Sequence, residues 1–239
     1  MTGWFPGPMA GFDLETTSPD PETARIVTAA LVVWNGAGIT KQMTWLANPG
    51  IEIPAEAAAI HGITTEDAIE RGADRAKVAY EVSAELVSVL LQGAPLVIYN
   101  APYDLTVLDR ETRRYGVEPF GGVFEGCTGR VIDPFVLDKY LDPYRRGKRT
   151  LTAACEHYGV KLDGAHDAAA DAIAAMRCAW KIGAASTTLA ALSTTALHDL
   201  QVKAKADQAA SFQDYLCKQG KTEVIDGSWP IKTWTAATA

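Results

Sequence analysis

The pattern of apolar and polar positions favours β-strands in the N-terminal part of the chain. Three stretches there are rich in β-formers and apolar residues: MAGFDLETT (9–17), RIVTAALVVWN (25–35) and ITKQMTWLA (39–47). The last two are separated by Asn-Gly-Ala-Gly, which is a typical hairpin turn. We therefore expect an antiparallel meander of three strands.

Helical and strand patterns alternate after the meander. Residues 53–72 predict a helical turn that begins at a proline, a loop at His61 and Gly62, and a short helix capped by Thr64 or Thr65. Helices are predicted over 74–92, from Pro102 to about 115, and near 134–141, 150–158 and 167–183, and further strands over 94–100 and 130–134. Three strands followed by this alternation predict an α/β fold, with a mixed five-stranded sheet and helices on both faces.

The composition changes near residue 184. Residues 184–216 are rich in alanine and contain little glycine or proline, which predicts one or two helices, and 224–234 reads as an extended tail. A chain of 239 residues can form one large core, or one domain with an appendage. We therefore expect a domain over 1–183 and a helical C-terminal extension over 184–239.

Composition places the chain among globular proteins in a reducing compartment. Hydrophobic residues make up 48% and charged residues 21%, and no apolar run is long enough for a membrane helix. The N-terminus lacks the pattern of a secretory signal. The cysteines are far apart, without a C-x-x-C pair: Cys127, Cys155, Cys178 and Cys217. This spacing argues against a zinc site and suits a reducing cytoplasm, where we expect the protein to be located. The lack of a long apolar run leads us to expect no membrane contact.

The formal net charge of −7 comes from 22 basic and 29 acidic residues. Taken alone, it disfavours nucleic acid as a partner. Carboxylates that hold divalent cations are locally near neutral, however, and so do not count against such a partner. The stretch YRRGKRT (144–150) concentrates four basic residues, Arg145, Arg146, Lys148 and Arg149. It fits either a solvated turn or a phosphate contact.

Two acids stand close together on the first predicted strand. Asp13 and Glu15 are two positions apart and so point to the same face. Their charges repel unless a cation lies between them, and carboxylate oxygens are the ligands that Mg²⁺ prefers. The alternative is a strand end that frays into solvent, where paired acids cost little.

Further acids and a histidine follow in two other stretches. Asp104 lies in the first turn of a helix, directly after the strand that Asn100 ends. If this strand is a parallel neighbour of the first, both bring their polar residues to one sheet edge. Asp171 shares a helix face with alanines, and His166 precedes that helix in a loop. The alternatives are helix capping for Asp104 and a capping or surface position for His166. His157 and His198 have no acids around them and read as structural.

The order and spacing of these residues resemble a known family. The three motifs are FDLET (12–16), NAPYD (100–104) and HDAAAD (166–171). They resemble the motifs of the DEDDh 3′–5′ exonucleases, which include the epsilon proofreading subunit of bacterial DNA polymerase III, RNase T and oligoribonuclease. The resemblance covers residues 8–183 and includes IHGIT (60–64). Two further stretches, 133–151 and 200–216, resemble actinobacterial and phage members.

The resemblance implies an RNase H-like fold and phosphodiester hydrolysis with two Mg²⁺ ions, for which Mn²⁺ can substitute. It implies that Asp13, Glu15, Asp104 and Asp171 hold the metals and that His166 takes the proton of the attacking water. By their position in the motifs, Leu14 and Thr16 are expected to contact the terminal nucleotide. Glu56 and His61, which bracket EAAAIH (56–61), are expected to contact its sugar or phosphate, and Asn100 is expected to position the site or the substrate backbone.

The resemblance favours single-stranded DNA with a 3′ end as the substrate, cleaved to nucleoside 5′-monophosphates in proofreading or repair. An exoribonuclease of the RNase T or oligoribonuclease type is the alternative, and a non-catalytic module that docks on a polymerase is a third. The C-terminal extension is a candidate contact for a DNA polymerase or a sliding clamp. Its stretch QAASF (208–212) resembles clamp-binding peptides, but it falls inside a predicted helix.

Overall fold

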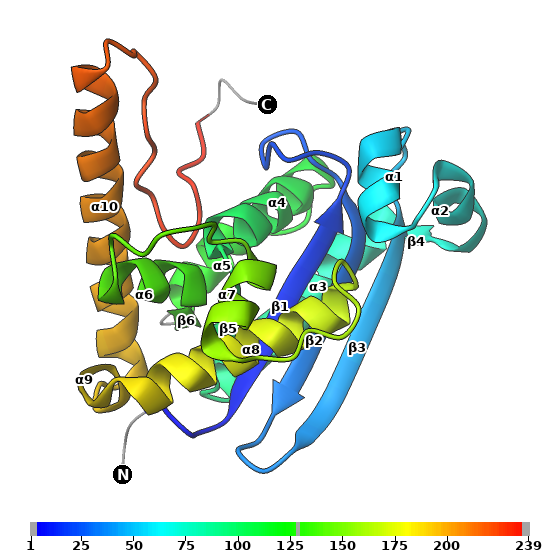
Figure 1. The fold of residues 1–239 in the computed structure, drawn as a ribbon. Helices are drawn as coiled ribbons and strands as arrows, with labels where there is room; N and C mark the ends of the chain where they lie inside the picture. The colour runs from blue at the N-terminus through cyan, green and yellow to red at the C-terminus, as the bar shows by residue number, and fades with distance from the viewer. Residues whose placement is uncertain (1–3, 128–129, 236–239) are drawn as a thin grey trace.

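The computed structural model describes residues 4–127 and 130–235, and its centre is a mixed β-sheet (Figure 1). The strands are β1 (Met9–Thr16), β2 (Ile26–Trp34), β3 (Ile39–Asn48), β4 (Ala73–Asp74), β5 (Leu96–Val97) and β6 (Val131–Ile132). They lie in the order β4-β3-β2-β1-β5-β6. β1, β2 and β3 are antiparallel neighbours, as the meander predicts, and β5 and β6 run parallel to β1.

The α/β fold with a mixed sheet is confirmed, but the expected number of five strands is wrong. The sixth strand is β4, which pairs in parallel with Ala47 and Asn48 at the end of β3. β4 has two exposed residues and therefore no apolar pattern that could reveal it. The strand expected over 94–100 has only two residues in the sheet ladder, Leu96 and Val97.

Helices surround the sheet. They are α1 (Ala55–His61), α2 (Thr65–Arg71), α3 (Arg75–Leu91), α4 (Ala101–Arg114), α5 (Phe120–Gly126), α6 (Pro134–Leu141), α7 (Leu151–Tyr158), α8 (Ala168–Ala185), α9 (Thr187–Ala190) and α10 (Thr194–Lys218). Thr64, not Thr65, caps α2, and Asp67 completes the capping box. The sequence pattern missed α5, which contains three glycines and is held by the buried Phe120 and Phe124.

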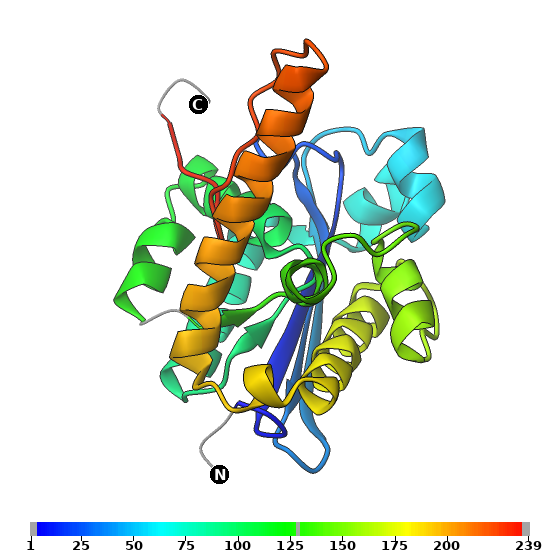
Figure 2. The ribbon, with the colours of Figure 1, turned by 60° about the vertical axis from the view of Figure 1, so that its left-hand side comes forward.

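The sheet has a helical layer on each face. Figure 2 views it nearly edge on, with α4 and α5 on one side and α7 and α8 on the other. Phe12 of β1 belongs to the core that β1 forms with α3 and α4. Met9 belongs to the second core, which the sheet forms with α8. The alternation along β1 therefore directs every second side chain toward α8.

Gly11 lets α8 approach β1 closely. A Cβ at this position would lie 2.5 Å from the backbone oxygen of Ala172, closer than any real contact. Asp13 is two residues further along the same strand and so lies on the same face as Gly11. The close approach brings the first turn of α8, which carries Asp171, beside Asp13.

The C-terminal segment packs on the rest of the chain. α10 packs against α6 and β6. Its buried Gln201 accepts a hydrogen bond from the backbone N–H of Asp133 (2.7 Å) and donates one to the carbonyl oxygen of Val131 (3.0 Å). Trp229, in the extended tail, is buried and donates to Asp133 Oδ2 (3.2 Å). Within the described residues, no helix has the length and hydropathy needed to cross a lipid bilayer.

Candidate active site

The carboxyl ends of β1 and β5 meet at one edge of the sheet, as expected if the two strands are parallel. Gly11 pairs with Val97, and β5 ends there, so beyond this point β1 is paired with β2 on one side but has no strand on its β5 side. Asp104 in the first turn of α4 takes that place: its Oδ1 accepts a hydrogen bond from the N–H of Leu14 (3.0 Å). Asp104 is only 3% exposed. The bond fixes its carboxylate against the strand between Asp13 and Glu15.

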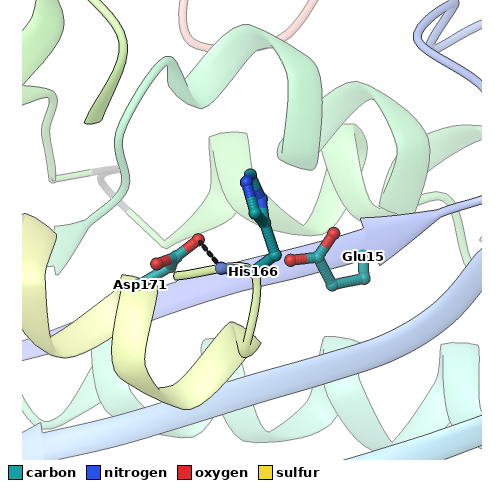
Figure 3. A group of neighbouring side chains, drawn as sticks. All are labelled: Glu15, His166 and Asp171. Carbon is teal, nitrogen blue, oxygen red and sulfur yellow. Dashed lines mark hydrogen bonds between the residues drawn. The ribbon is translucent and has the colours of Figure 1, made fainter. Parts of the chain in front are cut away.

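Glu15, His166 and Asp171 form a group whose potential ligand atoms all lie within 4.8 Å of one another. Figure 3 shows His166 between the carboxylates of Glu15 and Asp171. The backbone N–H of His166 donates to Asp171 Oδ2 (3.2 Å). The other oxygen, Oδ1, is buried and has no hydrogen-bond partner among the described residues. A buried carboxylate oxygen without a partner is costly, and a bound cation would satisfy it. The residues present therefore fit a divalent metal.

The carboxylates at this edge raise one another's pKa, because each negative charge disfavours ionisation of its neighbours. Burial raises the pKa of Asp13 well above its usual range, and the carboxylates of Asp104, Asp171, Glu15 and Asp167 raise it further. Burial and the charges of Asp171 and Asp167 raise the pKa of Glu15 to about 7. Burial likewise raises the pKa of Asp104 and of Asp171. Positive charge at this edge would stabilise all four carboxylates. Asp13 and Asp104 adjoin the group of Glu15, His166 and Asp171 without belonging to it.

Two residues at the site have a strained backbone. Among the described residues, only Asn100 and His166 combine a side chain with a positive φ, 64° and 69° respectively. Such conformations persist only where neighbouring groups hold them. Asp133 accepts hydrogen bonds from the N–H groups of Asn100 (2.9 Å) and Ala101 (3.0 Å), and Asp171 holds His166. Neighbouring carboxylates therefore hold both strained residues in place.

A cavity of about 730 Å³ opens beside the carboxylates. Its lining includes Glu15 and all five residues expected to bind the substrate: Leu14, Thr16, Glu56, His61 and Asn100. His61 accepts a hydrogen bond from the N–H of Ile63 at Nδ1 (3.2 Å), whereas its Nε2 is buried without a partner among the described residues. Burial and the charge of His166 lower the pKa of His61. Because Nδ1 accepts a hydrogen bond, the neutral imidazole carries its proton on Nε2 and can donate it to a ligand in this cavity.

Sequence reasoning missed three residues that shape the site. Tyr103 lines the cavity, and its hydroxyl bonds to Thr16 Oγ1 and to the backbone oxygen of Ser18. Asp167 caps α8 by accepting from the N–H of Ala170 (2.9 Å). Asp133 holds the backbone at Asn100. Each of the three had a signal in the sequence. Tyr103 lies inside the second motif, and Asp133 and Asp167 directly precede α6 and α8.

The two other histidines have packing contacts away from the site. His198 Nδ1 accepts a hydrogen bond from the N–H of Val131 (3.1 Å), and its ring centroid lies 4.8 Å from that of Trp229. His157 is exposed and packs against Tyr158, with 4.7 Å between ring centroids.

Comparison with known proteins finds relatives that are described as exonucleases. Residues 10–179 match the family model described as Exonuclease. The chain is 29% identical over 161 residues to the 3′-5′ exonuclease DinG of Bacillus subtilis (strain 168), covering 67% of this chain and 16% of DinG. It is 31% identical over 173 residues to the uncharacterized exonuclease CP81 of Escherichia phage 186, covering 70% of this chain and 84% of CP81. The DNA polymerase III subunit epsilon-like protein of Rhodobacter capsulatus is 29% identical over 168 residues, 68% of this chain and 22% of that protein.

Solved structures with the same fold include the zinc-bound complex of E. coli ExoI with single-stranded DNA. It superposes with a TM-score of 0.62 at 19% identity and covers 77% of this chain and 42% of ExoI. At this identity the match shows the fold alone, which is the RNase H-like fold of exonuclease I. The chain thus spans less than half of ExoI and less than a quarter of DinG and of the epsilon-like protein.

Proposed function

The chain belongs to the exonuclease family, and on that premise we propose that it is a metal-dependent 3′–5′ exonuclease that releases nucleoside 5′-monophosphates from single-stranded DNA. One observation carries the proposal: four carboxylates on β1, α4 and α8, and a histidine in the loop before α8, converge beside a cavity of about 730 Å³. Carboxylates with raised pKa values beside a cavity are typical of sites that use a bound cation.

We assign the metal ligands to Asp13, Glu15, Asp104 and Asp171. The four carboxylates suit two Mg²⁺ ions, with Mn²⁺ as a substitute, rather than zinc. When bound, such ions activate a water molecule and stabilise the charge on the phosphate and on the leaving oxygen.

His166 is the proposed general base. It lies in the exposed loop before α8, and its backbone is tied to Asp171, so its imidazole stands beside the metal ligands but is free to meet a water molecule. Asp171 would then have two roles: its Oδ1, which lacks a hydrogen-bond partner among the described residues, would be available to a cation, and its Oδ2 accepts a hydrogen bond from the backbone of His166.

The cavity is the proposed site of the terminal nucleotide. Leu14 and Thr16 at the end of β1 would contact the base and sugar, and Glu56 and His61 on α1 would contact the sugar or the phosphate. Asn100, held by Asp133, would orient the substrate backbone. Each of these residues lines the cavity.

Single-stranded DNA is the proposed polymer, a choice supported by the ExoI relative that was solved with that ligand. The same proposal includes three further points. The task is proofreading or repair, residues 184–239 bind a DNA polymerase or a sliding clamp, and the protein is cytoplasmic. We also keep 1–183 as the unit that carries the chemistry, since every proposed ligand lies in it.

Degradation of 5′-labelled oligonucleotides tests the proposal. Single-stranded DNA, duplex DNA and RNA are compared in Mg²⁺ and in excess chelator, together with DNA whose 3′ end is blocked by a phosphate. We expect a ladder of shortened single-stranded DNA that requires Mg²⁺ and a free 3′ end. Full activity in chelator, or equal cleavage of the blocked strand, would refute the proposal. If the protein prefers RNA, the proposed substrate changes from DNA to RNA, and the proposed metal-dependent hydrolysis from the 3′ end still holds.

A further inference from the structure

An open groove with aromatic walls lies between α6 and α10, outside the proposed catalytic site. Its volume is about 380 Å³. Four aromatic residues line it: Tyr140 at the end of α6, Tyr144 in the following loop, and Phe212 and Tyr215 on α10. We call it the α6–α10 groove.

These aromatic side chains are exposed to an unusual degree. Tyr144 is 91% exposed and Tyr215 57%. The rings of Phe212 and Tyr215 are stacked nearly parallel, at 13°, with centroids 6.3 Å apart. Exposed, clustered rings mark a binding surface, and flat rings of this kind are the platforms on which single-stranded bases stack.

Positive charge lies next to the rings. Lys139 lines the groove, and Lys205 and Arg149 stand close enough that, after burial, their charges lower the pKa of Lys139. One acid, Asp207, also lines the groove, but its carboxylate is paired with Lys203. Lys139 itself has no ion-pair partner among the described residues, and aromatic rings beside such a cation fit a polyanion that carries aromatic bases.

The loop 142–150 connects the groove to the nucleotide cavity. It leaves α6 beside α10 and crosses to α7 (Figures 1 and 2). Two of its arginines are anchored inward: Arg145 and Arg149 both bind the buried Asp138, the former at 2.9 Å. At its far end Tyr99, the residue before Asn100, donates to the carbonyl oxygen of Arg149 (2.8 Å). The loop therefore has a fixed course that ends at the catalytic edge of the sheet.

The remaining basic residues of the loop point outward. Arg146 and Lys148 are exposed and have no ion-pair partner within the described part of the chain. The basic stretch YRRGKRT thus contains two kinds of residue. Arg145 and Arg149 anchor the loop, whereas Arg146 and Lys148 are exposed cations, a division that a fully solvated turn would not show. Two free cations close together on a loop with a fixed course suit contacts to phosphates.

We propose that the strand whose 3′ end occupies the cavity continues along the loop 142–150, with phosphates on Arg146 and Lys148, and stacks its upstream bases in the α6–α10 groove. The inference rests on the proposed function and names the path of the substrate. It gives residues 184–239 a role, since α10 supplies one wall of the groove. Binding of a long oligonucleotide then depends on the groove, whereas cleavage of a substrate too short to reach it does not.

The test compares a 20-nucleotide single strand with the p-nitrophenyl ester of thymidine 5′-monophosphate, both with the full chain in Mg²⁺. The double variant Tyr144→Ala/Tyr215→Ala removes two rings at surface positions. The matched control is Tyr80→Ala, a tyrosine on α3 that is 61% exposed. We expect the double variant to raise KM for the 20-mer about tenfold or more, leaving kcat and the rate on the ester unchanged. Replacing both tyrosines with phenylalanine should restore the KM.

A second variant, Arg146→Gln/Lys148→Gln, tests the phosphate contacts through salt dependence. Each lost contact to a single strand should lower the slope of log K against log salt by about 0.7. Lys181→Gln on α8, also exposed, is the control and should leave the slope unchanged.

The possible failures are distinguishable. If the parent protein cleaves neither the ester nor the 20-mer, the proposed function fails and the inference with it. If it cleaves both and the groove variants match it in KM and salt slope, the inference alone is overturned. The latter result would mean that the groove receives a protein partner or nothing at all.

Discussion

Replacing Glu15 with glutamine should stabilise the metal-free protein above pH 7, although it removes a proposed metal ligand. The reason lies in the raised pKa of this carboxyl, about 7 in the folded protein against an ordinary value of 4.5. The folded state holds the proton more tightly than the unfolded state, so stability falls as pH rises from about 4.5 to about 7. A glutamine side chain does not ionise, so the variant does not lose this stability as the pH rises.

The separation of the two pKa values corresponds to at most about 3 kcal/mol. Because Glu15 is partly exposed, solvent screening reduces this to about 1–2 kcal/mol. In a protein of this size, that free energy raises the melting temperature by about 2–8 °C. The difference between variant and parent should be small near pH 5 and complete above pH 7.

The assay is thermal unfolding in chelator between pH 5 and 8.5, with Glu70→Gln as the control at an exposed glutamate on α2. In saturating Mg²⁺ the order should reverse, because a cation at about 100 times its dissociation constant stabilises by about 2.7 kcal/mol. Mg²⁺ should raise the melting temperature of the variant less than that of the parent. Equal melting temperatures at pH 8 in chelator, or a difference independent of pH, would refute the account of crowded carboxylates.

Four further changes test other parts of the site and fold. His166→Ala should slow single-turnover cleavage by about 10²–10⁴-fold and retain the stabilisation by Mg²⁺, and His166→Tyr should recover part of the rate; a parental rate would show that the histidine is not the base. Asp13→Ala should lose both the rate and the stabilisation by Mg²⁺, as thermal shifts with metal would reveal. Gly11→Ala should lower stability by about 1–3 kcal/mol in urea unfolding, because its Cβ would clash with Ala172, and an unchanged midpoint would contradict the close approach. Trp229→Ala should cost about 3 kcal/mol or more in the same measurement, since it removes a buried ring and a donor to Asp133, and a loss under 1 kcal/mol would contradict its place in the core.

The elements with strong periodicity were predictable from the sequence. The alternation along β1 placed Asp13 and Glu15 on one face, and the apolar run after residue 94 gave a buried strand parallel to β1. The convergence of the acids required one further condition, that these two strands be neighbours, which the sequence pattern alone left open.

Features that depend on tertiary packing were not predictable. β4 forms because α2 returns the chain to the end of β3, and its two residues carry no pattern of their own. α5 has poor helix formers and exists because Phe120 and Phe124 are buried. The bond between Trp229 and Asp133 joins residues 96 positions apart and has no local signal. The contact of Tyr103 with Thr16 likewise follows from the position of α4 beside β1.

The central claim is that the carboxylates at the end of β1 bind the cations that hydrolysis requires. Its most direct test is the number of Mn²⁺ ions bound per chain, measured by electron paramagnetic resonance, alongside the single-turnover rate at each Mn²⁺ concentration, for the parent and for Asp13→Asn. We predict two bound ions in the parent, a rate that rises as they bind, and the loss of at least one ion together with activity in the variant. A variant that binds two ions and cleaves at the parental rate, or a parent that cleaves with none bound, would contradict the claim.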